Sequence, residues 1–354
     1  MSAAPAAEAT AVSAIVVNHR RPGLTIECLA SLEAALERLG EPAELIAVDN
    51  GSGDGSSERI AARFPEARVI ALAENRGFAG AVNAGVEESS AEWVLLLNND
   101  ATLEPDAIAN LLEVGRRAKD IGSVAAQMRF AASPGVLNSA GIGVDRLGVA
   151  YDRRLGEPVP GDGGEPVEVF GASGGAALLR RAMLDELGGL DDSFFFALED
   201  VDLAWRARMA GWRALYAPGA VVWHHHGTTG RHTSAFKHFH VGRNRVRMLA
   251  KNAEPAHLRR YGAAIAAYEL AYVGYAVVAD RTLAPLRGRL RGLREWRAYR
   301  SAGAAGRGPV ELESVRGLRG ALRRRVAWDA AGPALDEKSA GEGVEEAGEG
   351  GAHE

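Results

Sequence analysis

The stretch WVLLLNND, residues 93–100, is a short apolar run that ends abruptly in three polar residues. Unbroken apolar runs of this length are typical of strands that are buried on both faces. Three earlier runs share the pattern: SAIVVN at 13–18, ELIAVDN at 44–50 and ARVIALAEN at 67–75. Segments with helical spacing, at 24–40, 56–64 and 79–89, separate the four runs. Strands that alternate with helices in this way predict βαβ units and a parallel sheet.

Polar residues collect where these strands are expected to end. In open α/β sheets, ligands bind at the carboxyl ends of the strands, near the point where the strand order reverses. Asparagine and aspartate also cap helices and form turns, and that role stays open for each residue taken singly. The repetition at four strand ends favours one shared site. Its candidate residues are Asn18, Asp49, Asn50, Asn75, Asn98, Asn99 and Asp100.

The glycine spacing argues against a dinucleotide-binding enzyme. The loop NHRRPG at 18–23 lacks the glycine fingerprint of that fold, and the glycine-rich GASGGA at 171–176 lies far from the first strand–helix turn. A dehydrogenase is therefore a poor fit. The segment VDNGSGDGS at 48–56 instead offers an acid and a loop of small residues, which suits hydrogen bonding to a base and close approach of the backbone to a ligand.

The second half of the chain is less regular. We expect a strand at 121–128, an exposed loop at 160–166 and a helix over 177–187 (ALLRRAMLDEL). The stretch FFFALEDVDLAWRARMAGW at 194–212 then predicts a helix that follows Leu-Glu-Asp and ends at Gly211. Asp202 and Arg206 form an i, i+4 pair on this helix, so a structural role accounts for Asp202. Such a role does not require Glu199 and Asp200 beside three aromatic residues.

The composition is that of a folded protein, with 47% apolar and 25% charged residues in a chain of 354. A single cysteine, Cys28, excludes an intrachain disulfide, and the first residues carry no secretory pattern, so we expect a cytoplasmic location. Charge is uneven: residues 281–325 hold thirteen Arg and three Glu, whereas 329–354 hold eight acids and one Lys. We expect a flexible N-terminus at 1–12 and a disordered acidic tail at 329–354.

Six ordered motifs resemble glycosyltransferase family 2, the inverting enzymes of the GT-A fold, and most of all its bacterial rhamnosyltransferase-type members. The motifs are AIVVNHRR, AVDNGSGDGS, ENRGFAGAVNAGV, LLLNND, GGLDDSFFFALEDVDLAWRARMAGW and APGAVVWHHHGTT. The resemblance covers about residues 12–252. It implies an α/β fold in which helices flank a mostly parallel, nucleotide-sugar-binding sheet over 13–252, followed by a helical extension.

The resemblance also implies how a nucleotide-sugar donor binds. Asp49 contacts the nucleotide base, while Asn75, Arg76, Gly77 and Asn83 lie beside the nucleotide sugar. Arg76 offers a planar fork for phosphate, and the helix that follows it presents amide groups to an anion. The alternative for Arg76 is an ordinary surface arginine.

The segment NND at 98–100 stands where many GT-A enzymes carry Asp-x-Asp, the motif that holds a divalent metal on the diphosphate. Because Asn98 replaces the first acid, Asp100 is the only carboxylate there. Mg²⁺ commonly uses one or two carboxylates together with substrate phosphates, so the site is still expected to bind Mg²⁺ or Mn²⁺. The resemblance implies His224 as the second ligand. A zinc site at histidines 224–226 is disfavoured, since neighbours on an extended chain point in opposite directions.

The resemblance assigns Asp200 as the base that deprotonates the acceptor hydroxyl, with Glu199 orienting the acceptor or Asp200. The preceding aromatics would exclude water. The structural alternative is a helix with acids in its first turn and no chemistry. The expected reaction is an inverting transfer, for which rhamnose from dTDP-rhamnose is the favoured donor, to a lipid-linked or polysaccharide acceptor. A nucleotidyltransferase and a catalytically weak, membrane-associated nucleotide-sugar-binding module are the alternatives.

Residues 253–328 are expected to form a helical basic extension. The apolar run at 262–278 is marginal as a transmembrane segment because it contains Glu269. An interfacial helix followed by arginines fits an anionic membrane at the inner face of the cell membrane. A helix packed on the catalytic domain is the alternative. No nucleic-acid partner is expected, since no recognised module accompanies the arginines.

Overall fold

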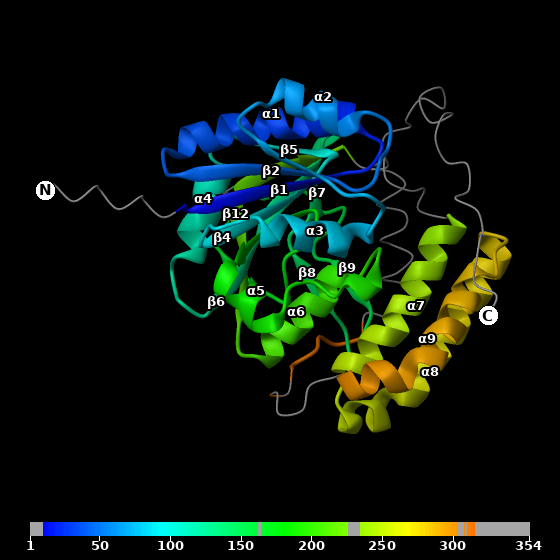
Figure 1. Cartoon of the computed structure of the whole chain (residues 1–354). Helices are drawn as coiled ribbons and strands as arrows, with labels where there is room; N and C mark the ends of the chain where they lie inside the picture. The colour runs from blue at the N-terminus through cyan, green and yellow to red at the C-terminus, as the bar shows by residue number, and fades with distance from the viewer. Residues whose placement is uncertain (1–9, 162–163, 226–233, 303–307, 309, 316–354) are drawn as a thin grey trace, which may run out of the picture.

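The chain folds into three layers, with helices on both faces of one large sheet and three further helices beside it (Figure 1). A computed structural model describes residues 10–161, 164–225, 234–302, 308 and 310–315. Most of the predicted flexible N-terminus and the whole predicted acidic tail lie outside these residues. Val12, at the end of the predicted N-terminus, already belongs to the first strand.

The first half of the chain forms the parallel part of the sheet. Strands β1, β2, β3 and β4 run parallel in the order β4-β1-β2-β3, and α1, α2 and α3 connect them. All four predicted strands and all three predicted helices are confirmed within a few residues at each end. Their bounds are β1 Val12–Asn18, α1 Pro22–Leu39, β2 Ala43–Asp49, α2 Ser56–Arg63, β3 Arg68–Ala71, α3 Gly77–Glu87 and β4 Trp93–Asn98.

The second half makes the sheet mixed. β11 (Ala176–Arg180) lies antiparallel between β4 and β6 (Ile121–Phe130), and β12 (Arg213–His224) runs parallel to β6. The predicted helix over 177–187 is therefore wrong in its first part: only Arg181–Leu187 forms α5, because the preceding apolar residues are buried as a central strand. The remaining elements are β5 Ala101–Leu103, α4 Ala107–Gly115, β7 Ser133–Ser139, β8 Ile142–Val144, β9 Ala150–Asp152, β10 Val167–Val169, the 3₁₀ turn η1 Asp192–Phe194 and α6 Glu199–Met209.

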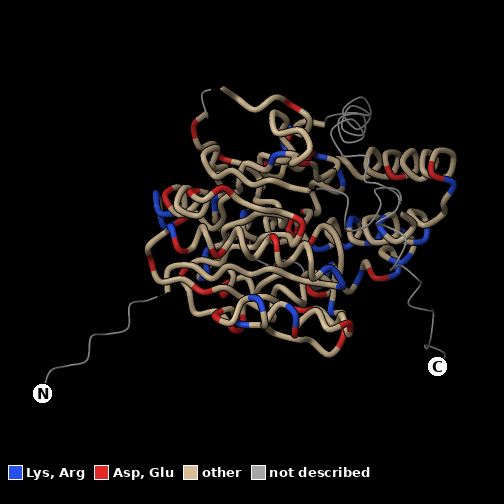
Figure 2. Tube along the Cα trace, turned by 90° about the horizontal axis from the view of Figure 1, so that it is seen from above, with Lys and Arg blue, Asp and Glu red and all other residues tan. Residues whose placement is uncertain are grey.

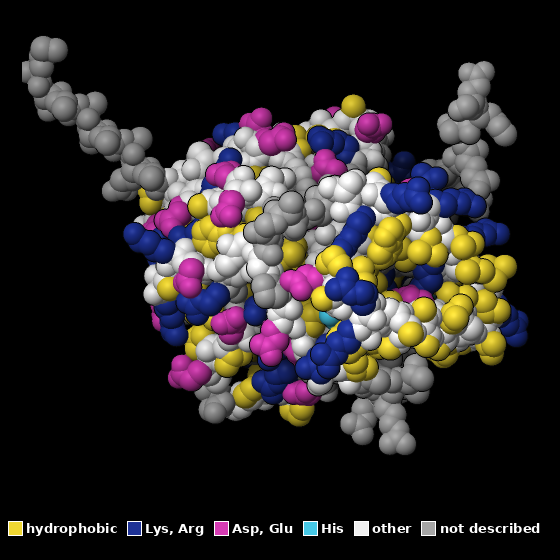
Figure 3. Space-filling model, turned by 90° about the horizontal axis from the view of Figure 1, so that it is seen from below, with side chains coloured by type: hydrophobic (Ala, Val, Ile, Leu, Met, Phe, Trp, Pro, Cys, Tyr) yellow, Lys and Arg dark blue, Asp and Glu magenta, His cyan; other side chains and the backbone are white. Residues whose placement is uncertain are grey.

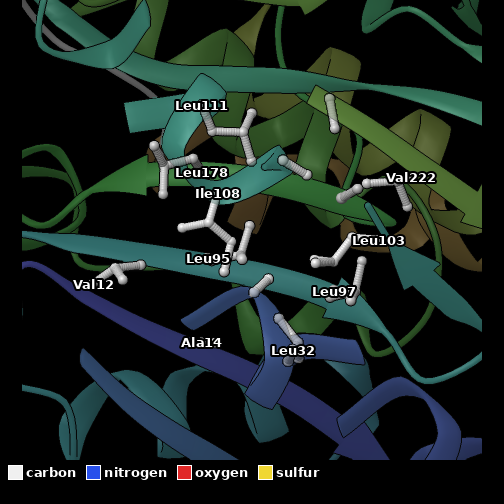
Figure 4. Packing of buried hydrophobic residues seen from close by; sticks show 14 of the residues in the cluster. Val12, Ala14, Leu32, Leu95, Leu97, Leu103, Ile108, Leu111, Leu178 and Val222 are labelled. Carbon is white, nitrogen blue, oxygen red and sulfur yellow. The ribbon is translucent and has the colours of Figure 1, made fainter. Parts of the chain in front are cut away.

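Alternate side chains of the buried strands supply two separate cores. On β4, Leu95 and Leu97 face the layer of α1, α2 and α4, where they pack with Leu32 and Ile108 (Figure 4). Val94 and Leu96 face the opposite layer, which contains α3, α5 and α6. Continuous apolar runs are needed because both faces of the sheet are covered. The polar strand ends are consequently left at the carboxyl edge, as predicted.

Helices α7 (Ala235–Asn252), α8 (Pro255–Ala279) and α9 (Ala284–Ala302) pack beside this body. A third apolar cluster joins them to α6 through Trp205, Met248 and Ile265. One acid joins all three helices: Glu269 of α8 forms salt bridges with Arg245 of α7 and Arg289 of α9. In Figure 2 the Lys and Arg residues of this region lie mainly on α7 and α9.

Within the described residues, α8 is the one helix long and apolar enough to cross a membrane by length and composition. Only two of its residues, Ile265 and Ala276, are buried. The helix thus packs on its neighbours along one side, and most of its surface is open.

Candidate active site

Asn18 and Asp49, at the ends of the adjacent strands β1 and β2, lie side by side in the sheet register. The Asn18 amide donates to the Asp49 carboxylate at 2.6 Å, and both residues are buried. Thr25, from the first turns of α1, donates to the Asn18 side-chain oxygen at 2.8 Å, and the Ser52 amide donates to Asp49 at 3.3 Å. The network fixes the Asp49 carboxylate. Thr25 and Ser52 were not predicted, although both stand in the polar loops that the strand ends pointed to.

Asn50, Asn75 and Gly77 form a second network one strand further along. The Asn50 amide donates to Asn75 at 3.0 Å and to the Gly77 carbonyl at 3.0 Å, while the Arg76 amide donates back to Asn50 at 2.8 Å. These bonds hold the loop before α3 in one conformation. The Arg76 guanidinium is left half-exposed, 3.4 Å from the Asp192 carboxylate.

Asn83 has contacts of a different kind. Its amide donates to the Leu190 carbonyl at 2.8 Å, and its oxygen accepts from the Leu190 amide at 3.0 Å. It therefore fastens α3 to the loop that precedes the acidic helix start. The Asn99 side chain donates to the Thr25 hydroxyl at 3.2 Å, and the backbone N–H of Asn98 donates to the Gly175 carbonyl at 3.0 Å. The structure thus brings the predicted strand-end residues to one edge of the sheet.

Asp100 and His224, although 124 residues apart, are neighbours. β12 pairs with β5 so that His224 lies opposite Ala101, and the His224 Nε2 is 3.2 Å from the Asp100 Oδ1. The other ring nitrogen of His224 is 3.0 Å from the Asn138 side-chain oxygen, which orients the ring. Asp100 is 5% exposed.

The spacing of Asp100 and His224 suits a pair of ligands to one metal ion. Two ligands about 2.1 Å from an octahedral ion lie about 3 Å apart when they are adjacent in its shell, and the observed 3.2 Å matches that spacing. A carboxylate and an imidazole suit Mn²⁺. Among the described residues, no group of three or more His, Cys, Asp or Glu could hold an ion alone. The pair fits a metal whose remaining ligands come from elsewhere, such as a diphosphate and water.

Glu199 and Asp200 lie in the first turn of α6, so the helix begins two residues earlier than predicted. The Gly174 amide donates to one Asp200 carboxylate oxygen at 2.9 Å, and the Val201 amide donates to the other at 2.8 Å. Burial raises the pKa of Asp200. Burial, together with the adjacent Asp200 charge, raises the pKa of Glu199 to about 8. The raised pKa favours the protonated form of Glu199.

Asp202 has the structural role that the spacing predicted. It is fully buried and accepts from Arg206 at 2.7 Å, as well as from Lys251 at 2.9 Å and Asn252 at 2.8 Å. These partners lie on α6 and α7. Asp202 therefore joins the two helices behind the site.

A glycine pair connects the two acidic centres. The Gly174 backbone N–H donates to the Asp200 carboxylate, and the carbonyl of the next residue, Gly175, accepts a hydrogen bond from the backbone N–H of Asn98, near Asp100. Asp152 of β9 lies in the same region: burial and the charge of Asp200 raise its pKa to about 6, and the nearby His224 and Lys237 oppose that rise. Neither Asp152 nor Lys237 was predicted, because nothing in their local sequence marks them.

The aromatic residues before the acids form a cluster with the start of α7. The Phe195 ring stacks on His240 with centroids 5.5 Å apart, and the Phe236 ring lies 4.3 Å from His240 and 5.3 Å from Phe196. Phe236 is half-exposed. The cluster is therefore an accessible apolar wall close to Glu199 and Asp200.

An α/β sheet with polar residues along its carboxyl edge, faced by a helix start that carries acids, is the arrangement of an enzyme that binds its ligand at that edge. The chain belongs to glycosyl transferase family 2, whose family model matches residues 13–188. The predicted family and enzyme class are therefore confirmed.

One relative is the N-acetylglucosaminyl-diphospho-decaprenol L-rhamnosyltransferase of Mycobacterium tuberculosis, which is 30% identical over 253 residues, 63% of this chain and 79% of the relative. Another is the poly-beta-1,6-N-acetyl-D-glucosamine synthase of Staphylococcus aureus, 25% identical over 202 residues; this match covers 56% of the chain and 46% of the synthase. By name, the first relative transfers L-rhamnose and the second makes a polysaccharide.

Solved structures confirm the predicted GT-A fold. GalNAc-T7 with UDP, GalNAc and Mn²⁺ superposes with a TM-score of 0.57 and 14% identity, over 83% of this chain and 57% of that one. TarS residues 1–349 from S. aureus in complex with UDP-GlcNAc superposes with a TM-score of 0.53 and 17% identity, over 81% and 80% of the two chains.

Proposed function

We propose that the protein is an inverting rhamnosyltransferase that uses dTDP-rhamnose and a lipid-linked or polysaccharide acceptor in cell-wall or surface-glycan synthesis. The observation that supports the reaction type is that the Gly174–Gly175 turn contacts both Asp200 and the backbone of Asn98, which lies two residues before Asp100, the neighbour of His224. The choice of sugar rests on the mycobacterial relative, whose name specifies L-rhamnose and a diphospho-decaprenol acceptor.

The donor would lie along the carboxyl edge of β1, β2 and β4. Asp49, held by Asn18 and Ser52, would bind the base. Arg76 would bind the diphosphate, because its guanidinium has one weak, exposed partner among the described residues and stands at the start of α3, where the helix dipole favours an anion. Asn50, Asn75 and Gly77 keep that loop in place, and Asn83, Asn98 and Asn99 support its surroundings.

Asp100 and His224 would hold Mg²⁺ or Mn²⁺ together with the donor diphosphate. When bound, the ion would neutralise charge on the departing nucleoside diphosphate. The protein's own part is to set the two ligands at one spacing: β12 fixes His224 against β5, and Asn138 orients its ring. Second-sphere contacts of this type set both the orientation and the basicity of a histidine ligand.

Asp200 would act as the base. The acceptor oxygen forms a bond to the anomeric carbon while the bond from that carbon to the diphosphate oxygen breaks, and the acceptor proton passes to Asp200. Two backbone amides direct the Asp200 carboxylate, and the raised pKa makes it a stronger base than a solvated aspartate. A protonated Glu199 beside it adds no second negative charge at neutral pH. The wall of Phe195, Phe196 and Phe236 would exclude water.

We further propose that α8 and α9 lie on the anionic inner face of the cell membrane, where a lipid-linked acceptor resides. Residues 261–279 carry one charge, Glu269, and it is turned inward to Arg245 and Arg289. Figure 3 shows hydrophobic side chains gathered over these helices with Lys and Arg beside them. The exposed apolar side chains are Leu270, Tyr275, Val277 and Val278 on α8, and Leu290 and Leu293 on α9. Basic side chains next to apolar ones suit anionic headgroups.

A transfer assay tests the proposed function. Purified protein is incubated with a lipid-linked GlcNAc diphosphate acceptor and with dTDP-rhamnose, UDP-sugars or GDP-sugars, with Mn²⁺ or with EDTA. We expect rhamnosylated lipid of inverted anomeric configuration with dTDP-rhamnose, and loss of product in EDTA. Donor binding without transfer would instead indicate a binding module. Release of inorganic diphosphate from dTTP when a sugar 1-phosphate is supplied, with formation of a dTDP-sugar, would indicate a nucleotidyltransferase; either result overturns the proposal.

A further inference from the structure

The loop that leads into Glu199 and Asp200 has an unfavourable backbone. Phe195, Ala197 and Leu198 have φ values of 60°, 67° and 70°, in the left-handed region that side chains with a Cβ rarely adopt. Three such residues within four positions persist only when surrounding contacts hold them. Leu198 also begins α6 without a side-chain cap, so the helix start receives no local support from that position.

Each backbone carbonyl from Ser193 to Leu198 accepts a hydrogen bond. The Phe195 carbonyl accepts from the Phe78 amide at 2.7 Å, and the Leu198 carbonyl from the Asp202 amide at 3.0 Å. The others are bound by α7. The Asn244 amide reaches the carbonyls of Phe194 at 2.7 Å, Phe196 at 2.8 Å and Ala197 at 2.8 Å, whereas Arg243 and Arg247 bind the carbonyl of Ser193.

Asn244 is the centre of this arrangement. It is fully buried, and its single amide group serves three carbonyls of one loop turn. The three carbonyl oxygens converge on one nitrogen, and because the amide carries only two protons, they share them. That convergence fixes the curvature of the loop. Only one residue, Leu198, separates the last of these carbonyls from Glu199.

We propose that Asn244 is a positioning residue, which sets the catalytic geometry of Glu199 and Asp200 by fastening the loop 193–198; this inference rests on the proposed function. Without the amide, the carbonyls of Phe196 and Ala197 would lose the donor that Asn244 provides, while Phe194 would keep Arg243 at 2.9 Å. The loop would then relax from its left-handed conformation. Asp200 would then leave the Gly174 amide. A displacement of about 1 Å in a reacting group costs on the order of 100-fold in rate.

The test compares two buried asparagines of α7. Asn244→Leu removes the amide that binds the loop, whereas Asn252→Leu removes a donor to Asp202 and leaves the loop bonds intact. Hydrogen–deuterium exchange of residues 193–201 and transfer rates normalised to the folded fraction are measured for both. For Asn244→Leu we expect faster loop exchange, a turnover on the order of 100-fold lower at an unchanged donor KM, and an acid limb of the pH profile shifted to lower pH.

The shift in the pH profile separates positioning from loss of stability, because hydration of the loosened helix start lowers the raised pKa of Asp200. Loop exchange and turnover equal to those of Asn252→Leu would overturn the inference. If Asn244→Leu does not fold, Asn244→Ser, which keeps one donor, carries the same measurements. If the wild type transfers no sugar, the proposed function fails by itself, while exchange still decides whether Asn244 fastens the loop.

Discussion

Replacing Gly77 by alanine should separate two costs that a glycine can avoid. Gly77 has φ +72°, and a Cβ built on it would lie 2.3 Å from the Phe195 carbonyl oxygen. Gly188 has the same φ of +72°, but nothing lies within 4 Å of its added Cβ. The left-handed conformation costs about 1–2 kcal/mol for a residue with a Cβ. Both variants bear this cost, and only Gly77→Ala must also displace the Phe195 backbone.

Overpacking of this kind adds about 1–3 kcal/mol. We therefore expect Gly188→Ala to lose about 1–2 kcal/mol in free energy of unfolding, measured by urea titration, with its transfer rate unchanged. Gly77→Ala should lose about 2–5 kcal/mol. Its turnover should fall on the order of 100-fold, because the loop that carries Phe195 also positions Asp200. Equal stability and equal turnover in the two variants would refute the claim that this close approach places the acid.

Asp200→Asn should abolish transfer while calorimetry still detects donor binding, and a near wild-type rate would remove Asp200 from the role of base. The pKa of Glu199 is about 4.5 in the unfolded chain and is raised to about 8 by burial in the folded protein. Between these two values only the folded protein keeps the proton, so the free energy of unfolding decreases as the pH rises through this window. Glu199→Gln should therefore gain stability relative to the wild type at pH 8.5 but not at pH 4; a constant difference across pH would contradict the pKa. Leu270→Glu with Val278→Glu should reduce sedimentation with anionic vesicles at least roughly 10-fold, whereas Val167→Glu, at an exposed site on β10, should not.

The elements that could be predicted from the sequence are those whose environment is uniform. β1, β2 and β4 contain long apolar runs because both of their faces are covered, so their pattern needs no tertiary information. Residues 177–179 are equally apolar, but whether they extend as a strand or begin a helix depends on β4 and β6, which lie far away in sequence. The error in the predicted helix has that cause.

The same distinction applies to the site. Asn18 and Asp49 could be predicted because parallel strands bring their carboxyl ends to one edge. Asp152 and Gly174 could not, since they come from a short hairpin strand and a glycine turn whose approach to Asp200 exists only in the folded chain. Asn244 could not be predicted either, since its three carbonyl partners lie almost fifty residues earlier.

The paired Glu269 also determines how the molecule can sit on a surface. A rotation of α8 about its own axis would separate Glu269 from Arg245 and Arg289. Breaking a buried salt bridge of this kind costs about 3–5 kcal/mol. The open side of α8 therefore keeps a constant bearing relative to α7 and to the loop that α7 holds. A bilayer bound to this side of α8 would therefore hold the proposed active site at a fixed height and orientation above its surface.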